Sequence, residues 1–416
     1  MSARSPDGVD AVLPRGARDL LPGAARRRRA VTDALLAVFD RWGYDPVVTP
    51  AIEYFAVFGR WLAERERQRC VRFIEAGSGE LVTLRSDITP QIARLAEQQL
   101  RERLAAGEAV RLCYAADVVR LSEGAREQSE RHQVGVELLG DDAPEADAEL
   151  ILLADAALRA AGVAGATLEV ADVGIARGVF ERLPSCDVEA LHGLLARKDA
   201  AGVARFAAGL DLGEEPRRWL GLLCELFGAP GILEHVPEDI RATWPWLAER
   251  LARLEDTLAL VRGRAPELHA RLVVDLGEVR GFDYYTGLRL RAWAPGSARP
   301  LVVGGRYAGG AGFAVELDAL EVSLDATDGD RAARAGGVMI AVHGREPRLR
   351  AAASARAEAE RAAGRRAWIQ AGLSLEAAQA AAAEADELVY IGADERAEIW
   401  SQGQPGAWRR AEESGA

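Results

Sequence analysis

Strand-forming segments stop near residue 177 of this 416-residue chain and resume only near residue 270. Between them lie short amphipathic helical patterns such as DVEALHGLLARKD and PRRWLGLLCELFG, with no convincing strand. Because strands continue afterwards with RLVVDL and RPLVVGGRY, a helical insert in one sheet-based domain explains the sequence better than a separate domain. We expect a core domain over 1–335 with the insert at 177–269, and a short C-terminal α/β segment over 336–416.

Strands before the insert read as hairpins and not as strands alternating with helices. CVRFIEAGSGELVTLRSD forms two strands around a turn, and VRLCYAADVVRL is joined to ERHQVGVELLG by a polar loop. ITPQIARLAEQQLRERLAAG follows the first hairpin as a helix, with Thr89 as its N-cap and Pro90 in its first turn. This arrangement predicts an α+β fold, an antiparallel sheet flanked by helices, and argues against a Rossmann sheet.

Several shorter segments complete this prediction. A helix is expected from about Ala24 to Trp42, and GVMIAVHG, RRAWIQAG and the segment ending in ELVYIG suggest a small β-α-β unit. The end, GQPGAWRRAEESGA, is expected to be frayed. VGGRYAGGAGF lacks both GxGxxG and GK[ST], so it is only weakly indicative of a phosphate loop. Four arginines at 26–29 are typical of a solvated helix face, although a nucleic-acid patch is the alternative.

Composition narrows the class of protein. The formal net charge is −12, which argues against broad contact with nucleic-acid phosphates. The four cysteines form no CxxC pair and the five histidines are scattered, so we expect small buried thiols and neither disulfides nor a metal site. No apolar run approaches the ~20 residues that span a bilayer, and the N-terminus lacks the apolar core of a secretory signal. A cytoplasmic protein without membrane contact is expected.

Five polar clusters fall at the ends or turns of predicted strands: LRSDIT, VVRL, RHQVGVE, VRGFDYY and GGRY. Carboxylates such as Asp87 and Glu137 suit an ammonium group or an imidazole N–H, and the guanidinium groups of Arg120 and Arg280 suit a carboxylate. Tyrosines supply flat walls and hydroxyl partners. Together these side chains would fit an amino acid better than a nucleotide.

Gln133 and Glu137 are four residues apart, so on a strand they face the same side. Two such groups would be costly to bury without partners. If they faced solvent, the ladder of Val134, Val136 and Leu138 would form the buried face. From this cluster alone, a solvated face and a pocket are equally consistent with the sequence.

Four motifs, in order, resemble the catalytic domain of class II histidyl-tRNA synthetases. They are RGARDLLP, LRSDITPQIAR, VRGFDYYTG and GGRYAGG, and the similarity runs from about Leu13 to Leu320. The resemblance implies a class II aminoacyl-tRNA synthetase-like sheet, and VVTPAIEY around Pro50 resembles that family's dimer-forming segment, which implies self-association as a dimer. The positions implied to form a histidine pocket are Asp87, Thr89, Arg120, Gln133, Glu137, Arg280, Tyr284, Tyr285 and Tyr307.

The resemblance breaks down in the motif that closes synthetase ATP sites. That motif has the form GFGxGxERL, with its arginine over the ATP phosphates, whereas this chain has GFAVELDAL. Glu316 replaces a glycine, Asp318 the glutamate and Ala319 the arginine, which should be severe for adenylate formation. The loop RLSEGAREQSERHQ is one residue short and has Ser122 where a glutamate is usual, although Glu123 could serve instead. The C-terminal segment is short and not basic, a poor anticodon reader.

A histidine pocket beside a degraded ATP site resembles the regulatory subunit of ATP phosphoribosyltransferase, a paralogue of the synthetases. LRSDITPQIAR and GFAVELDAL both look like that family's versions of the motifs. The resemblance implies no catalytic residues and no cofactor, no tRNA contact, a short-form catalytic partner subunit, and histidine feedback on the first step of histidine biosynthesis. A divergent histidyl-tRNA synthetase is the alternative, and a pseudoenzyme with another partner, such as a translation regulator, is the third possibility.

Overall fold

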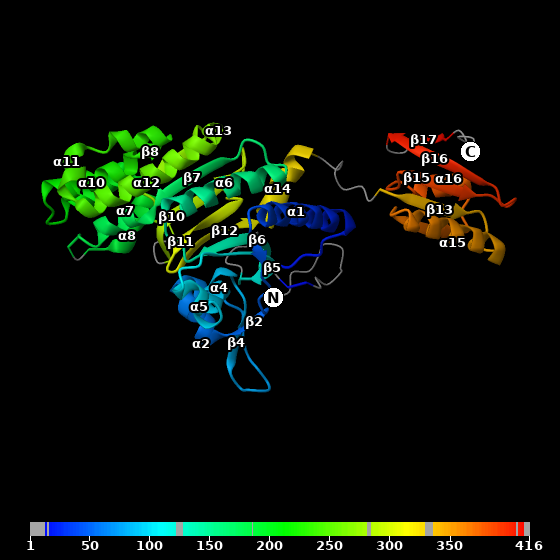
Figure 1. The fold of residues 1–416 in the computed structure, drawn as a ribbon, viewed down its shortest axis with the longest axis horizontal. Helices are drawn as coiled ribbons and strands as arrows, with labels where there is room; N and C mark the ends of the chain where they lie inside the picture. Colours follow the sequence, from blue (N-terminus) through cyan, green and yellow to red (C-terminus); the bar gives the residue numbers. More distant parts are fainter. Residues whose placement is uncertain are drawn as a thin grey trace, which may run out of the picture. The chain divides into compact units, whose positions relative to one another are not determined.

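The computed structural model describes residues 13–14, 16–121, 128–184, 186–280, 284–328, 336–404 and 407–411. The described residues fall into two compact units (Figure 1). The larger contains residues up to Asp19 and from Arg28 to Thr327, and the smaller contains Leu20–Arg27 and residues from Asp328 onward. Within the described ranges, no helix is long and apolar enough to cross a membrane.

The larger unit is built on a sheet with nine described strands in the order β1-β5-β6-β12-β11-β10-β7-β9-β8. Neighbouring strands are antiparallel except in the pairs β1–β5 and β7–β9. The predicted pairing across residues 110–139 is confirmed, and the glycine-rich stretch after Val302 is a hairpin and not a phosphate loop. The strands are β1 (Asp45–Pro46), β5 (Val110–Val119), β6 (Glu130–Leu139), β7 (Thr167–Asp172), β8 (Phe227–Gly228), β9 (Leu272–Asp275), β10 (Tyr285–Trp293), β11 (Val302–Tyr307) and β12 (Gly310–Glu316).

The two faces of this sheet pack against different helices. Helices α1 (Pro22–Arg41) and α6 (Pro144–Ala160) share a hydrophobic core with one face, where Phe39 and Phe313 meet edge to face (Figure 1). The ladder of Val134, Val136 and Leu138 points into this core. Because side chains alternate along a strand, residues 133 and 137 point to the opposite face. That second face also carries a smaller core beneath helix α4 (Thr89–Gln98).

A small three-stranded sheet, β2-β4-β3, projects beside α4. Its strands are β2 (Ile52–Tyr54), β3 (Arg72–Ile74) and β4 (Leu81–Leu84), and the predicted β3–β4 hairpin is confirmed. The predicted N-cap at Thr89 is wrong, because α4 begins at Thr89 and Ile88 occupies the cap position. The carboxylate of Asp87 accepts the Thr89 N–H at 3.1 Å instead.

Short helices replace strands between β7 and β9, in the region where the sequence predicts the insert. They are α7 (Val173–Phe180), α8 (Val188–Ala196), α9 (Ala200–Ala208), α10 (Glu214–Glu225), α11 (Glu238–Thr243), α12 (Pro245–Arg264) and α13 (Pro266–His269). Trp219 and Leu247 from these helices belong to the main core. The sequence predicts no strand here, but the two residues of β8 extend the sheet beyond β9.

The smaller unit contains a β-α-β arrangement with added antiparallel strands. Its sheet has the order β14-β13-β15-β16-β17, with β13 parallel to both β14 and β15. The expectation of a frayed end is wrong for residues 407–410, because β17 pairs with β16 and Trp408 Nε1 donates to the Gln379 carbonyl. The elements are β13 (Val338–Val342), α15 (Pro347–Ala362), β14 (Ala367–Ala371), α16 (Leu375–Ala381), β15 (Glu387–Ile391), β16 (Ala397–Gln404) and β17 (Ala407–Arg410).

The four cysteines are free thiols. Cys70 and Cys113 are buried, in agreement with the expectation from the sequence. Cys186 and Cys224, both in the helical insert, are only partly buried.

Candidate functional site

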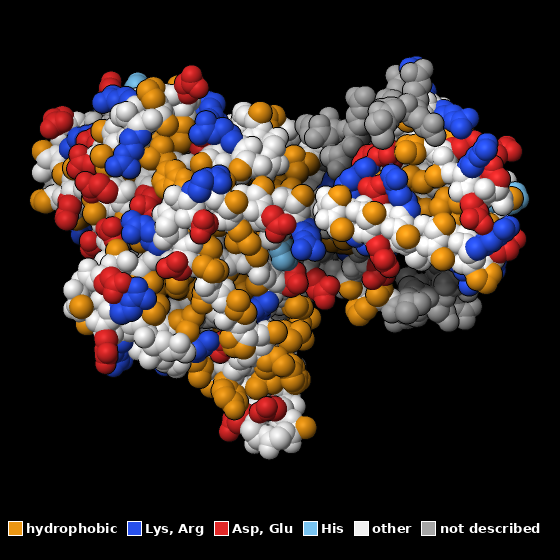
Figure 2. All heavy atoms as spheres, turned by 45° about the vertical axis from the view of Figure 1, so that its right-hand side comes forward, with side chains coloured by type: hydrophobic (Ala, Val, Ile, Leu, Met, Phe, Trp, Pro, Cys, Tyr) orange, Lys and Arg blue, Asp and Glu red, His pale blue; other side chains and the backbone are white. Residues whose placement is uncertain are grey.

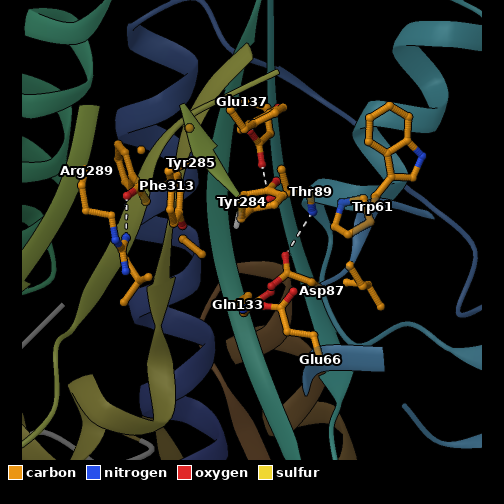
Figure 3. Close-up of a pocket in the computed structure, with 18 of the residues that line it drawn as sticks. Trp61, Glu66, Asp87, Thr89, Gln133, Glu137, Tyr284, Tyr285, Arg289 and Phe313 are labelled. Atoms are coloured by element: carbon orange, nitrogen blue, oxygen red, sulfur yellow. Dashed lines mark hydrogen bonds between the residues drawn. The ribbon is translucent and has the colours of Figure 1, made fainter. Parts of the chain in front are cut away.

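A pocket lies on the α4 face of the main sheet, over strands β6, β12, β11 and β10 (Figure 3). Its volume is about 200 Å³. Small residues form its floor, among them Gly304, Gly305 and Gly312. A β-carbon at position 312 would lie 2.2 Å from Oε2 of Glu137, so glycine here leaves room for that carboxyl group.

Glu137 is the most deeply buried acid of the pocket, with 1% of its surface exposed. Its Oε1 accepts a hydrogen bond from Thr89 Oγ1 at 2.6 Å, and its Oε2 accepts one from Tyr307 Oη at 2.8 Å. Burial raises the pKa of Glu137 to about 8, although these two hydrogen bonds act in the opposite direction. The pocket therefore holds a carboxyl group that is mostly protonated at neutral pH.

Asp87 and Arg120 form an ion pair beside Glu137, with Arg120 Nη2 2.5 Å from Asp87 Oδ2. Arg120 Nε also donates to the Ser86 carbonyl at 2.6 Å. Burial alone would lower the pKa of Arg120, but the negative charges of Asp87 and Glu316 outweigh it and the pKa is raised. Arg120 is thus held in its ionised form at the pocket wall.

Three tyrosines form the aromatic wall. Tyr284 stacks on Tyr307 with ring centroids 5.5 Å apart, and it meets Tyr285 edge to face at 4.9 Å. Figure 3 shows Tyr284 close to Glu137 and Thr89, with Tyr285 toward Phe313 and Arg289. Burial raises the pKa of all three phenols, so they are neutral hydrogen-bonding groups.

Gln133 lies opposite Glu316 across the β6–β12 pair, four residues along each strand from the pair of Glu137 and Gly312. Its Nε2 donates to Glu316 Oε1 at 2.8 Å. Its Oε1 is buried and has no partner among the described residues. Gln133 and Glu137 are both almost fully buried, so the pocket alternative holds for this cluster and the solvated-face alternative is wrong.

Eight of the nine residues proposed from the sequence line this pocket: Asp87, Thr89, Arg120, Gln133, Glu137, Tyr284, Tyr285 and Tyr307. Arg280 does not. Its backbone N and its Nε both donate to Glu278 Oε1, and its side chain is 45% exposed. Gly281, Ser122 and Glu123, which the motif comparison also used, lie outside the described residues.

Sequence reasoning missed other pocket residues. Trp61 lies in the 3-10 turn Gly59–Trp61 and Glu66 in helix α3 (Glu64–Gln68), in a stretch without a strong periodic pattern. Burial and the nearby charge of Asp87 raise the pKa of Glu66. Arg289 comes from β10, where the alternation of arginines with apolar residues was the available signal. With Glu316, the pocket has four carboxyl groups and two guanidinium groups, which favours a ligand that brings N–H donors or positive charge.

Carboxylates and arginines pair with one another where β12 leads into helix α14 (Leu317–Asp328). Asp318 Oδ1 accepts from Nη2 of both Arg18 and Arg28 at 2.7 Å, and Glu321 Oε1 accepts from Arg28 Nε at 2.7 Å. Ala319 packs against the hydrophobic core. This position therefore supplies no cation, and the nearby cations are bound to carboxylates.

One group of three carboxylates in the described residues is close enough to hold a metal ion: Glu169, Asp275 and Glu278. Arg291 Nη2 contacts both Glu169 and Glu278, and Lys198 Nζ contacts Asp275. Side-chain cations thus occupy the places that a metal would neutralise, and the group is an ion-pair network.

The chain is similar to known proteins over most of its length. Residues 16–326 match the family model described as histidyl-tRNA synthetase. The chain is 33% identical to an ATP phosphoribosyltransferase regulatory subunit from Syntrophotalea carbinolica, over 82% of this chain and 81% of the relative. It is 36% identical to one from Anaeromyxobacter dehalogenans, over 77% of this chain and 93% of the relative.

A solved structure is similar over most of the chain. It is titled as an ATP phosphoribosyltransferase regulatory subunit/histidyl-tRNA synthetase from Bacillus halodurans and superposes with a TM-score of 0.76 at 25% identity. The alignment covers 91% of this chain and 98% of that protein. The fold is therefore of the class II histidyl-tRNA synthetase type, as the sequence motifs predict.

Proposed function

The chain belongs to the family of ATP phosphoribosyltransferase regulatory subunits, and from this premise we propose that it is the non-catalytic subunit required by a short-form catalytic ATP phosphoribosyltransferase. In this role it binds L-histidine in the pocket and carries histidine feedback to its partner at the first step of histidine biosynthesis. The observation that carries the proposal is the buried carboxyl group of Glu137, held by Thr89 and Tyr307.

Histidine matches this pocket chemically. Its imidazole ring is flat and carries an N–H that Glu137 can accept, while Tyr284 and Tyr307 offer aromatic faces. Its ammonium group suits the acids of the wall. A ligand N–H or positive charge at Glu137 favours the ionised carboxylate, which burial disfavours in the empty pocket.

The residues where β12 leads into helix α14 support the proposal that this chain does not form an aminoacyl-adenylate. Ala319 stands where the synthetase motif has its phosphate-binding arginine, and Asp318 adds negative charge beside it. Arg18 and Arg28 are nearby cations, but both pair with Asp318 and Glu321. ATP phosphates at this position would therefore be repelled by carboxylates, since the nearby arginines are already paired. We assign no catalytic residue and no cofactor to this chain.

Self-association as a dimer is part of the proposal. The small sheet exposes large apolar side chains, including Phe73 (41%) and Ile74 (63%) on β3 and Ile52 (48%) on β2. Figure 2 shows hydrophobic side chains gathered just above the projecting tip at the bottom of the view. Apolar patches of this kind mark protein interfaces. Light scattering should therefore detect a dimer, and a compact monomer in dilute solution would argue against this assignment.

The central test uses the complex reconstituted with the catalytic subunit. We expect Glu137→Gln and Tyr284→Phe each to raise the histidine concentration needed for half-inhibition by roughly tenfold or more, because each removes a buried hydrogen-bonding contact to a charged ligand. Because coupling between the two sites is reciprocal, weaker histidine binding should also weaken histidine's inhibition of the partner.

Tyr390→Phe is the matched control, because it removes a tyrosine hydroxyl that is bonded to the Leu373 carbonyl in the smaller unit. It should leave half-inhibition unchanged. If all three variants kept the inhibition of the unaltered complex, the feedback site would lie elsewhere.

A further inference from the structure

Three arginines on strands of the main sheet are more than nine-tenths buried: Arg289 (8% exposed), Arg291 (4%) and Arg306 (9%). Two of them have carboxylate partners. Arg291 pairs with Glu169 and Glu278, and Arg306 pairs with Asp147 at 2.7 Å. Arg289 has no ion pair with any described residue, although buried charges are normally paired.

Strand register explains why Arg289 lacks a partner. Arg289 and Arg291 lie two residues apart on β10 and so share one face. Glu169 on β7 lies directly across from Arg291, whereas Arg289 lies across from Ala171 on β7 and Gly305 on β11. Neither neighbouring strand therefore places an acid opposite Arg289.

The contacts of Arg289 hold its guanidinium group and leave one edge free. The group lies over the Tyr285 ring, 4.4 Å from the centroid, and Nη1 donates to the Gly304 carbonyl at 2.6 Å. Nε and Nη2 have no hydrogen-bond acceptor in the described part of the chain, and Nε is fully buried. These two nitrogens share the edge of a guanidinium group that binds carboxylates in a bidentate manner.

Other cations are already engaged or lie elsewhere. Arg120 is bound to Asp87, and Arg280 is turned to Glu278 outside the pocket. Burial alone would raise the pKa of Glu278. The positive charges of Arg291 and Arg280, with a smaller contribution from Arg289, outweigh burial and lower that pKa. Its oxygens are nevertheless occupied by Arg280 and Arg291.

We propose that Arg289 is a specificity-determining residue of the pocket, and that it binds the α-carboxylate of the amino-acid ligand. The inference rests on the proposed function, since it takes histidine as that ligand. It assigns the two ends of the ligand to different strands, with Glu137 on β6 at the imidazole or ammonium end and Arg289 on β10 at the carboxylate end. The role that the sequence assigns to Arg280 passes to a residue nine positions later.

The test compares L-histidine with L-histidinamide, in which a neutral carboxamide replaces the carboxylate. Binding to the full-length chain and its Arg289→Gln, Arg289→Lys, Arg280→Gln and Glu137→Gln variants is measured by calorimetry. The unaltered protein should prefer histidine by roughly tenfold to a hundredfold. Arg289→Gln should bring that preference close to one while keeping histidinamide affinity, which also shows that the variant is folded. Arg289→Lys should retain part of the preference, and Arg280→Gln all of it.

An unchanged preference in Arg289→Gln, or a preference lost in Arg280→Gln instead, would overturn the assignment of Arg289. If Glu137→Gln still weakened histidine binding in that case, the histidine pocket would stand without this residue. If Glu137→Gln had no effect on either ligand, the proposed pocket itself would be wrong and the inference would fall with it.

Discussion

The two ends of strand β12 receive polar side chains in opposite ways. Around Gly312 they converge on an open pocket: Glu137 lies opposite Gly312, and Arg289, level with Gly312 across β11, has no acceptor for its Nε among the described residues. Where β12 leads into α14, carboxylates and arginines form ion pairs with one another. A buried polar group without a partner costs free energy, and where such a group lines a pocket a ligand can supply the missing contact.

The ion-paired groups where β12 leads into α14 indicate the opposite, that no ligand is needed to complete their contacts. Asp318 and Glu321 satisfy Arg18 and Arg28, so this end gains nothing from a bound anion. Under the proposed function, one strand of a synthetase-like fold keeps ligand recognition beside Gly312 and leads into ion pairs at α14.

The largest expected effect tests whether the α14 end has lost adenylate chemistry. We expect histidine-dependent pyrophosphate exchange at least about a hundredfold to a thousandfold below that of a histidyl-tRNA synthetase, because one lost charge-stabilising donor has an effect of that size. The assay is run beside an active synthetase, and histidine binding is measured in parallel to show that the pocket is occupied. Exchange at a synthetase-like rate would break the comparison and favour the divergent-synthetase alternative.

Much of this comparison could be predicted from the sequence, because it depends on local strand periodicity. The alternation of Gln133 and Glu137 with an apolar ladder fixes which side of β6 faces the core. The motif changes at Ala319 and Asp318 are visible without a structure. Only their pairing with Arg18 and Arg28, nearly 300 residues away, required coordinates.

The parts that could not be predicted depend on contacts distant in the chain. Arg280 precedes β10 and pairs with Glu278, whereas Arg289 follows a register shift on β10 and lines the pocket. Trp61 joins the site through a tertiary contact and belongs to no periodic pattern. The end at 407–410 looks frayed from its glycine and proline, yet pairing with β16 orders it as a strand.

A smaller expected effect is a pH dependence of the free energy of unfolding, which follows from the protonation of Glu137. Its pKa is about 8 in the folded protein and about 4.5 in the unfolded chain. Between these values the unfolded chain has released a proton that the folded protein keeps, so the contribution of Glu137 to stability is complete below pH 4.5 and falls as pH rises toward 8. Its slope is at most about 1.4 kcal/mol per pH unit.

Glu137→Gln cannot titrate, and other groups cancel in the difference between the two proteins. Denaturant unfolding across pH 4.5–8 should therefore show the advantage of the unaltered protein shrinking with rising pH. A difference independent of pH would mean that Glu137 is ionised in the empty pocket, and the pocket would then hold its charge ready for a cation.

The smallest expected effect is the loss of folding stability when the ion pairs of Arg18 or Arg28 near α14 are removed. Arg18 is 38% exposed where it pairs with Asp318 and Glu321, whereas Arg28 is 19% exposed and bonds to the same two carboxylates through both Nε and Nη2. Solvent weakens the more exposed pair, so Arg18→Ala should lower the free energy of unfolding by less than about 1 kcal/mol and Arg28→Ala by more. Neither should alter histidine affinity, because these ion pairs lie outside the pocket lining. A tenfold loss of histidine affinity in Arg18→Ala would show that the α14 end still communicates with the ligand, and the two ends of β12 would then form a single site.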